Sequence, residues 1–197
     1  MNETLKFYDE QAEHFAAGTV NVDFSATQQD FVSYIPAGGK VLDLGCGSGR
    51  DSKAFMKMGY QVVAMDGSRE MSRLASELIG QEVICATFQD YEPDAPFDGI
   101  WACASLLHLE KTAIRDMLQK YAYALKPGGV FYVSFKYGNF AGMRNGRFFT
   151  DLDEEALNTM LESIPELKVV KIYITEDVRA DRAGERWLNA FLEKTAI

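Results

Sequence analysis

The residues best suited to chemistry lie in the stretch VLDLGCGSGR, which spans 41–50. Three glycines alternate there with other residues, at Gly45, Gly47 and Gly49, and the carboxylate of Asp43 precedes them. Glycine lets a backbone approach a ligand closely and adopt dihedral angles that other residues resist. An apolar run leads into this stretch and a helical pattern follows it. We therefore expect a ligand-binding turn between a buried strand and a helix.

The spacing of these glycines discriminates between ligands. A dinucleotide fingerprint, G-x-G-x-x-G, would need its third glycine at position 50, where the chain has Arg50. No Gly-Lys-Ser/Thr sequence follows, which excludes a Walker-type phosphate loop. The carboxylate of Asp43, two residues before the first glycine, suits a ligand that carries a cation near the loop better than it suits a pyrophosphate.

A second carboxylate, Asp66, ends the next expected strand. An acidic residue about twenty positions after a glycine loop is placed to accept hydrogen bonds from both hydroxyls of a ribose. A free diol, the lack of a pyrophosphate site and a carboxylate near a cation together describe S-adenosylmethionine better than NAD. The alternative is that Asp43 and Asp66 do no more than cap turns.

Short apolar runs alternate along the chain with segments of helical period, which predicts an α/β fold with a parallel sheet covered on both faces. We expect strands at 40–45, 61–65, 82–86, 99–104, 130–135 and 168–175. We expect helices at 51–58, 69–79 and 111–125. A further helix should follow Thr150, which forms a capping-box pattern with Asp153. The periodicity of 185–194 fits either a helix or a strand.

Length and charge narrow the class of protein. The 197 residues suit a single domain, with a helical lid region at 1–38 and an α/β core at 39–197. The net charge of −9 argues against binding to nucleic acid. No apolar run is long enough for a membrane helix, and the polar start is no signal peptide. The cysteines are three in number and far apart, which predicts reduced thiols in a cytoplasmic protein: Cys46, Cys85 and Cys103.

The motifs together resemble those of the class I S-adenosylmethionine-dependent methyltransferases. VLDLGCGSGR resembles the first motif of that family, FDGIW at 97–101 the start of its fourth strand, and LKPGG at 125–129 the turn before its fifth. GRDS at 49–52 and NGR at 145–147 are similar to the tellurite-resistance-like branch. The resemblance implies a Rossmann-like, seven-stranded, mostly parallel sheet. Its antiparallel last strand lies between the fifth and sixth, which makes 186–193 a strand.

The resemblance also implies S-adenosylmethionine as cofactor, with S-adenosylhomocysteine as the product. Tyr8 resembles part of the N-terminal helix that lies over the cofactor in small-molecule methyltransferases. The region 86–90 departs from the family, because it lacks an acidic residue followed by alanine for the adenine amino group. Phe88 is expected to pack on the adenine ring, and Gln89 or Asp90 to bond its edge. The expected cofactor-binding residues are Tyr8, Asp43, Gly45, Cys46, Gly47, Arg50, Asp66, Gly67, Phe88, Gln89 and Cys103.

Methyl transfer from a sulfonium needs alignment, a dry site and, for some acceptors, a base, but no metal. No cluster with metal-ligand spacing occurs in the sequence. His108 is the histidine expected near the reaction centre, where it acts either as a general base or as an anchor for the loop after the fourth strand. Cys103 is either a cofactor contact or a small buried hydrophobe. His14, like Tyr8, is a candidate to close over the cofactor.

A local excess of positive charge predicts the nature of the methyl acceptor. The region 117–150 has no acidic residue, and Arg144 and Arg147 lie there in an expected Gly- and Asn-rich loop at 136–149. Two guanidinium groups among apolar side chains suit a small anionic acceptor held bidentately. The alternative is that both arginines pair with nearby acids such as Asp151 and Asp153.

These observations predict a methyltransferase with a small-molecule substrate, for which Arg144 and Arg147 predict an anionic group. They predict no nucleic-acid or membrane partner and a monomer or homodimer. Two alternatives remain open. One is a non-catalytic S-adenosylmethionine-binding protein with a blocked acceptor pocket. The other is an NAD-dependent oxidoreductase, which Arg50 in place of glycine disfavours.

Overall fold

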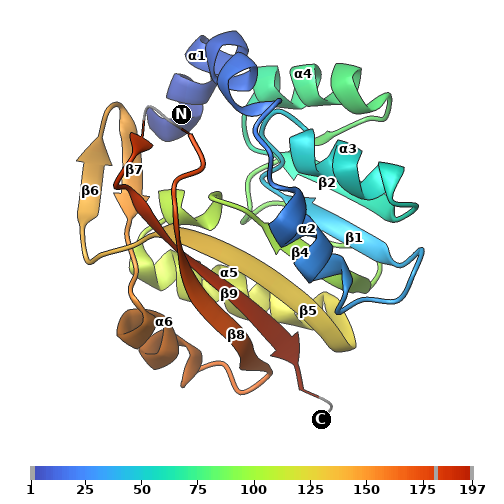
Figure 1. Cartoon of the computed structure of the whole chain (residues 1–197), viewed down its shortest axis with the longest axis vertical. Coiled ribbons are helices and arrows are strands. Elements are labelled where there is room, and N and C mark those ends of the chain that lie inside the picture. Colours follow the sequence, from blue (N-terminus) through green and yellow to red (C-terminus); the bar gives the residue numbers. More distant parts are fainter. Residues whose placement is uncertain (1–2, 180–181, 196–197) are drawn as a thin grey trace.

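The fold is an α/β sandwich built on one large sheet, in a computed structural model that describes residues 3–179 and 182–195 (Figure 1). The strands of this sheet are β1 (Lys40–Leu44), β2 (Gln61–Asp66), β3 (Ile84–Cys85), β4 (Phe97–Ala102), β5 (Leu125–Lys136), β8 (Leu167–Glu176) and β9 (Arg186–Lys194). A two-stranded hairpin lies apart from it, made of β6 (Ala141–Arg144) and β7 (Arg147–Thr150).

The strand order, β3-β2-β1-β4-β5-β9-β8, creates a crevice beside β1. The chain runs from β1 to β2 on one side and returns to β4 on the other. Open α/β sheets bind ligands at such a switch point, outside the carboxyl ends of the strands. Strand β9 is antiparallel to both β5 and β8, between which it lies. The expected seven-stranded sheet with an inserted antiparallel strand is therefore confirmed.

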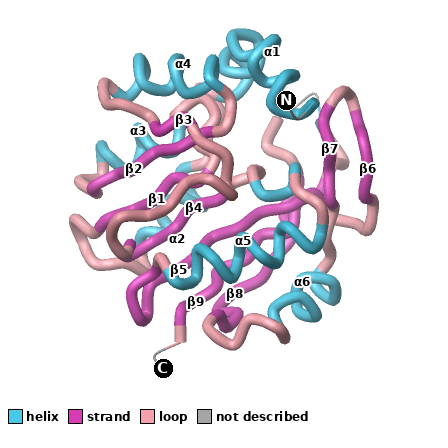
Figure 2. The backbone as a smooth tube through the Cα atoms, turned by 180° about the vertical axis from the view of Figure 1, so that it is seen from behind, coloured by secondary structure: helices cyan, strands magenta, loops and turns pink. Residues whose placement is uncertain are grey.

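Helices cover both faces of the sheet. They are α1 (Glu3–Thr19), α2 (Ser25–Val32), α3 (Arg50–Lys57), α4 (Arg69–Ile79), α5 (Lys111–Tyr123), α6 (Glu154–Leu161) and the short 3₁₀ helix η1 (Leu106–His108). Helices α5 and α6 lie on the face that Figure 2 turns toward the viewer. The opposite face packs against α2, α3 and α4 through Phe31, Phe55 and Ala75.

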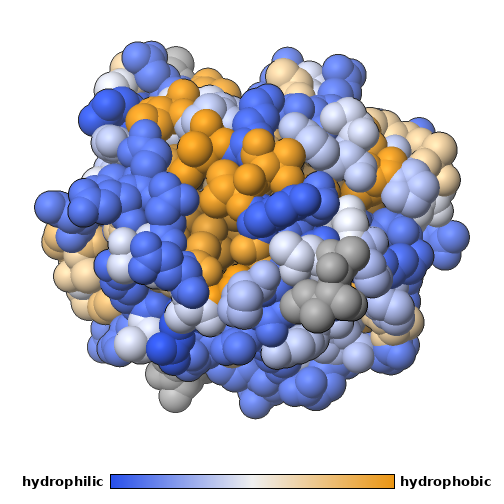
Figure 3. Space-filling model, turned by 90° about the horizontal axis from the view of Figure 1, so that it is seen from below, coloured by the Kyte–Doolittle hydropathy of each residue, from blue (hydrophilic) through white to orange (hydrophobic). Residues whose placement is uncertain are grey.

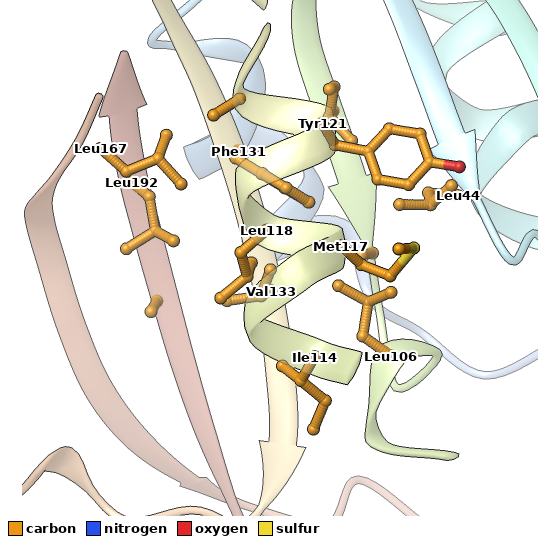
Figure 4. Packing of buried hydrophobic residues seen from close by; sticks show 14 of the residues in the cluster. Leu44, Leu106, Ile114, Met117, Leu118, Tyr121, Phe131, Val133, Leu167 and Leu192 are labelled. Carbon is orange, nitrogen blue, oxygen red and sulfur yellow. The ribbon is translucent and has the colours of Figure 1, made fainter. Parts of the chain in front are cut away.

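The apolar periodicity of α5 explains how it docks. Ile114, Leu118 and Tyr121 recur at helical spacing, and all three are fully buried against the sheet. Figure 4 shows Leu118 beside Val133 of β5, and the Tyr121 ring extending toward Leu44 of β1. Burial of each such side chain stabilises the fold by about 1.5–3 kcal/mol. This layer holds β4 and β5 in place, and β4 carries residues of the crevice.

Aromatic stacking fixes the opposite face beside the crevice. Trp101 of β4 stacks on Tyr132 of β5, with ring centroids 4.1 Å apart and an interplanar angle of 21°. Phe31 and Phe55 meet the same indole edge-on, at 5.1 and 5.2 Å. Aromatic pairs in such geometries add about 0.5–1.5 kcal/mol beyond their buried area. The result is a rigid wall behind the carboxyl end of β4.

Helix α1 is tied down at two points within its first two turns. Thr4 Oγ1 accepts a hydrogen bond from the Phe148 backbone N–H at 3.0 Å. Asp9 Oδ1 accepts one from the Ser68 hydroxyl at 2.6 Å. Helix α1 therefore spans from the β6–β7 hairpin to the start of α4, and Figure 1 shows it lying across one end of the sheet.

Four local predictions were wrong in detail. The expected strand 82–86 is reduced to two paired residues in β3, and β5 begins at Leu125, before the expected turn at 127–129. The expected loop 136–149 contains the β6–β7 hairpin. Thr150 does not cap α6, because its hydroxyl donates to the Leu109 carbonyl at 2.7 Å. Asp153 is the cap, accepting from the Ala156 N–H at 2.8 Å.

The surface is mostly polar, in keeping with the charge of the chain. Figure 3 shows the molecule from one end, where apolar side chains gather in a hollow with polar residues around it. Among the described residues, no helix combines the length and hydropathy needed to cross a bilayer.

Candidate active site

A cavity of about 300 Å³ lies at the carboxyl ends of β1, β2 and β4, under α1. The structure brings most of the sequence-predicted residues together in its lining: Tyr8, Gly45, Cys46, Gly47, Arg50, Asp66, Gly67, Phe88, Gln89, Cys103, His108 and Arg147. Asp43 and Arg144 are not part of that lining. His14 is exposed and lies outside it as well.

The glycine loop needs its glycines for two different reasons. Gly45, Gly47 and Gly49 have φ angles of 83°, 53° and 80°, in the left-handed region that favours glycine. A Cβ at Gly45 would also lie only 2.5 Å from Cβ of Ser105. At Gly47 the nearest atom to an added Cβ would be Cε of Met71 at 3.9 Å, so conformation alone selects glycine there.

Asp66 presents an unpaired carboxylate to the cavity. Its Oδ2 accepts from the Gly47 N–H and its Oδ1 from the Ser68 N–H, both at 2.9 Å. No cation of the described residues forms an ion pair with it. Burial raises the pKa of Asp66, although the two backbone hydrogen bonds oppose that rise. Each carboxylate oxygen keeps a lone pair that a ligand hydroxyl can use.

Asp43 lies behind the glycine loop. It is 2 % exposed, and its Oδ2 accepts from the Ser52 hydroxyl at 2.6 Å. Burial, then the neighbouring charge of Asp51, raises the pKa of Asp43. Asp43 was expected among the cofactor-binding residues, near a ligand cation, but the structure places it outside the cavity lining. The carboxylate instead ties the end of β1 to the first turn of α3.

Arg50 lines the cavity, and its charge is already paired with that of Asp51. Its Nε and Nη2 donate to the two oxygens of Asp51, both at 2.8 Å, and its guanidinium lies 4.8 Å from the centroid of Phe24. Asp51 also accepts from Trp101 Nε1 at 2.9 Å and from Gln28 Nε2 at 2.6 Å. This network was not predicted, because it joins α2, α3 and β4. It fixes the direction in which Arg50 enters the cavity.

The turn after β3 supplies one apolar and two polar groups. Phe88, Gln89 and Thr87 line the cavity. The Phe88 carbonyl accepts from the Tyr121 hydroxyl at 2.9 Å, which anchors this turn to α5. Asp90 is turned away from the cavity and accepts from the Thr87 hydroxyl at 2.7 Å. Of the two candidates for the adenine edge, the structure therefore places Gln89 at the cavity.

Tyr8 and His108 form a hydrogen-bonded pair above the end of β4. His108 Nδ1 lies 2.7 Å from the Phe148 carbonyl oxygen, which can only accept, so Nδ1 carries the proton. Burial lowers the pKa of His108 to about 4, and the charge of Arg147 acts in the same direction, against the hydrogen bond to Phe148. In the neutral ring Nε2 is an acceptor, and the Tyr8 hydroxyl donates to it at 2.9 Å.

Arg147 is a buried cation without a carboxylate partner among the described residues. It is 9 % exposed, and its Nη1 donates to the Tyr8 oxygen at 3.2 Å. Its guanidinium lies 4.7 Å from the centroid of Phe7 and 5.1 Å from that of Phe149. Its Nε is buried and has no hydrogen-bond partner within the described part of the chain. The positive charge is therefore stabilised by aromatic faces and one neutral hydroxyl, and not by a carboxylate of the described residues.

Arg144 behaves differently, although it flanks the same turn. Its Nη2 donates to Asp151 Oδ2 at 2.9 Å, and its guanidinium packs 4.3 Å from the centroid of Phe140. The ion-pair alternative is thus the one that the structure shows for Arg144. The structure does not bring this residue to the cavity.

The two cysteines of the site are thiols without an activating base. Cys103 Sγ lies 3.9 Å from both Arg50 Nη2 and the Ser134 oxygen. Burial raises the pKa of Cys103 to about 12, with Asp51 adding to the rise. Burial likewise raises the pKa of Cys46 well above its usual range. Both side chains are protonated at neutral pH and serve as packing groups in the wall.

The far wall of the cavity was missed by the sequence analysis. It comes from the ends of β5, β8 and β9: Ser134, Lys136, Thr175, Glu176, Asp177, Val178, Arg179, Arg182, Trp187 and Asn189. Most of its charges are compensated, since Lys136 pairs with Glu185 and Arg179 with Asp177. Burial opposes ionisation of Asp177, but hydrogen bonds from Arg179 and Trp187 outweigh it and hold its pKa at about 2.

Comparison with known proteins agrees with this geometry. A family model described as a methyltransferase domain matches residues 41–129, which contain the glycine loop, Asp66 and Phe88. Residues 41–129 are thus similar to a methyltransferase domain. The matched span ends at Gly129, within β5, so the family model leaves the hairpin and the far wall unassigned.

Individual relatives cover the chain to different extents. A ubiquinone biosynthesis O-methyltransferase from Bradyrhizobium sp. (strain ORS 278) is 32 % identical over 105 residues, which are 50 % of this chain and 40 % of that protein. A 2-methyl-6-phytyl-1,4-hydroquinone methyltransferase from Synechocystis sp. is 28 % identical over 138 residues, 61 % of this chain and 42 % of that one. The chain thus spans less than half the length of these curated relatives.

A solved structure shares the fold over nearly the whole chain. Burkholderia thailandensis 1,6-didemethyltoxoflavin-N1-methyltransferase, with bound 1,6-didemethyltoxoflavin and S-adenosylhomocysteine, superposes with a TM-score of 0.78 at 20 % identity. The match covers 98 % of this chain and 87 % of that one. At this identity the likeness shows the fold alone.

Proposed function

We propose that the protein is an S-adenosylmethionine-dependent methyltransferase that acts on a small-molecule acceptor. The observation that carries the proposal is the position of Asp66. Its carboxylate is partly buried, unpaired and open to the cavity, at the end of the strand next to the glycine loop. The methyltransferase names of the curated relatives support the same activity.

The residues present fit S-adenosylmethionine. Asp66 has two free lone pairs for a ribose diol, and burial raises its pKa although two backbone N–H groups donate to it. Phe88 offers an apolar face and Gln89 a polar edge for the adenine. The glycine loop lets the backbone approach the ligand. When bound, S-adenosylmethionine supplies a sulfonium methyl group, which is transferred as the carbon–sulfur bond breaks with its electron pair on sulfur.

The contribution of the chain is alignment and exclusion of water. Helix α1 closes one side of the cavity through Leu5, Tyr8 and Phe15, and the stacked Trp101 stiffens the strand below. Holding two reactants in line in a dry site can supply about 7–11 kcal/mol of the barrier. The protonated thiol of Cys103 adds no competing nucleophile. Catalysis by position therefore suits the lining that the structure shows.

The acceptor is a small anion, on the same proposal. Burying an unpaired charge is costly, and a ligand of opposite charge removes that cost. Arg147 is the cation of the lining that is both largely buried and without a carboxylate partner among the described residues. A carboxylate or oxyanion in the cavity would pair with it. Arg144 is not part of this subsite, because Asp151 already satisfies it.

Turnover tests the proposed function. The purified chain is incubated with S-adenosylmethionine and a panel of small carboxylates and phenols, and S-adenosylhomocysteine is measured by mass spectrometry. We expect its formation to depend on an acceptor from the panel and to be reduced in Asp66→Ala. A chain that binds S-adenosylmethionine but gives no acceptor-dependent product would favour the non-catalytic alternative.

A further inference from the structure

The hydroxyl proton of Tyr8 has a fixed destination. Phe148 accepts from His108 Nδ1, so Nε2 has only a lone pair to offer, and Tyr8 must donate to it. The lowered pKa of His108 keeps this arrangement at neutral pH. Consequently the phenol oxygen cannot donate into the cavity. Toward a ligand, Tyr8 is an acceptor only.

Arg147 completes the complementary half of the subsite. It donates one hydrogen bond to Tyr8, and the structure gives its other nitrogens no hydrogen-bond partner among the described residues. The Tyr8 oxygen is a hydrogen-bond acceptor with one free lone pair, and the Arg147 guanidinium is a cationic donor. The two groups therefore lie side by side in the cavity wall. The flat rings of His108 and Phe149 lie beside them.

We propose that Tyr8 and Arg147 together select an aromatic acceptor that carries an anionic oxygen and, elsewhere on the same ring, an O–H or N–H group. Arg147 pairs with the anionic oxygen, and the Tyr8 oxygen accepts a hydrogen bond from the O–H or N–H, whose heteroatom receives the methyl group. His108 acts through Tyr8 by holding its proton away from the ligand, so it is a positioning residue. This inference rests on the proposed methyltransferase function.

The hydrogen bond between the acceptor and Tyr8 also affects the methyl transfer itself. A hydrogen bond from the acceptor heteroatom to Tyr8 fixes the hydrogen on one side and leaves a heteroatom lone pair for the methyl carbon. As the heteroatom bonds to the methyl carbon, the carbon–sulfur bond breaks with its electron pair on sulfur and the O–H or N–H proton is released to water, so in the methylated product the contact with Tyr8 is lost. The subsite therefore binds the acceptor better than the product, which favours release.

Binding of benzoate and its three monohydroxy isomers tests the inference. Titrations are performed by calorimetry with the whole chain saturated by S-adenosylhomocysteine, so that the cofactor site is tested in the same experiment. We expect at least one hydroxybenzoate to bind about fivefold more tightly than benzoate, the size of one neutral hydrogen bond. In Tyr8→Phe that advantage should vanish while benzoate binding changes less than about twofold. In Arg147→Gln all four ligands should bind about tenfold more weakly.

The outcomes separate the two proposals. Loss of S-adenosylhomocysteine binding to the wild type would defeat the proposed function itself. If S-adenosylhomocysteine binds but all four benzoates bind alike, bind undetectably, or keep their order in Tyr8→Phe, the acceptor subsite is wrong. Circular dichroism and retained S-adenosylhomocysteine binding show that each variant is folded.

Imidazole ¹⁵N spectra test the role of His108 separately. The chain has 2 histidines, His14 and His108, so ¹⁵N spectra of the imidazoles are simple to assign with a His14→Gln variant. We expect His108 to be protonated on Nδ1 at about pH 7, with an Nε2 resonance that moves in Tyr8→Phe. Tautomer averaging, or an Nε2 resonance unchanged in Tyr8→Phe, would contradict the fixed proton. His108→Gln, which keeps an acceptor near the Nε2 position, should retain the hydroxybenzoate preference that His108→Phe loses.

Discussion

The phenol oxygen of Tyr8 lies 2.9 Å from Nε2 of His108, although 100 positions separate the two residues in the chain. One residue belongs to α1 and the other to η1, after β4. The contact therefore joins the helix over the cavity to the short helix that follows β4. Since His108 also binds the Phe148 carbonyl at 2.7 Å, three segments meet at this imidazole.

His108 should make the stability of the fold depend on pH. Its pKa is lowered to about 4 in the folded protein, against an ordinary value of about 6.5 in the unfolded chain. Between these values the unfolded chain binds more protons, so stability falls as the pH drops. The loss approaches about 3 kcal/mol below pH 4.

Urea unfolding from about pH 7 to pH 4, in the wild type and in His108→Gln, measures this effect. Carboxylates titrate in both proteins, so the difference between the two curves isolates the imidazole. We expect the wild type to lose more stability than the variant as the pH falls. Parallel curves would show that His108 is not buried as a neutral ring.

Gly45→Ala should destabilise the fold more than Gly59→Ala. Both glycines have positive φ, 83° and 90°, so the backbone strain is matched. Only Gly45 faces a steric clash, with Cβ of Ser105 at 2.5 Å, whereas nothing lies within 4 Å of an added Cβ at Gly59. We expect an additional loss of about 1–3 kcal/mol in the free energy of unfolding. Equal losses of stability in the two variants would mean that the loop after β4, which carries Ser105, moves aside at no cost in free energy.

Arg147→Gln and Arg144→Gln form a matched pair for the acceptor. The two residues face each other across the turn of the hairpin, but only Arg147 lines the cavity. We expect Arg147→Gln to raise the KM of an anionic acceptor about tenfold and to leave S-adenosylmethionine affinity nearly unchanged. Arg144→Gln should change neither constant by more than about twofold. An equal rise of KM in both variants would point to a general charge effect instead of a specific contact.

Local motifs were enough to predict which residues meet at the carboxyl ends of β1 and β2. The glycine loop and Asp66 are defined by residues close together in sequence, at the ends of two adjacent strands. Asp43 was misplaced because a motif fixes the order of side chains and not the face on which each lies. Alternate residues of a strand point to opposite sides, and Asp43 points toward Ser52, behind the loop.

For β9, hydrophobic periodicity does not identify the secondary structure. Strand β9 is paired on both edges and covered on both faces, so Phe191 and Leu192 are equally buried and no alternation remains. The family resemblance identified this segment as a strand, where its own pattern did not. The far wall, with Asp177 and Trp187, depends on that strand order and was therefore missed.

The hairpin carried a signal that the sequence analysis overlooked. Asn145 and Gly146 have φ angles of 51° and 78°, as a two-residue turn requires, and an Asn-Gly pair is a strong short-range indicator of such a turn. Recognising it would have placed Arg144 and Arg147 opposite each other. Which of the two enters the cavity still depends on Asp151 and on the contact of Arg147 with α1.

Calorimetric titration with S-adenosylmethionine, S-adenosylhomocysteine and NAD tests the central claim most directly. We expect the wild type to bind both adenosyl ligands and not NAD, and Asp66→Ala to lose about 1.5–3 kcal/mol of binding free energy because charged hydrogen bonds to the ribose disappear. Asp90→Ala, which removes a carboxylate turned away from the cavity, is the matched control and should bind as the wild type does. Binding of NAD, or an Asp66→Ala affinity equal to that of the wild type, would contradict the account.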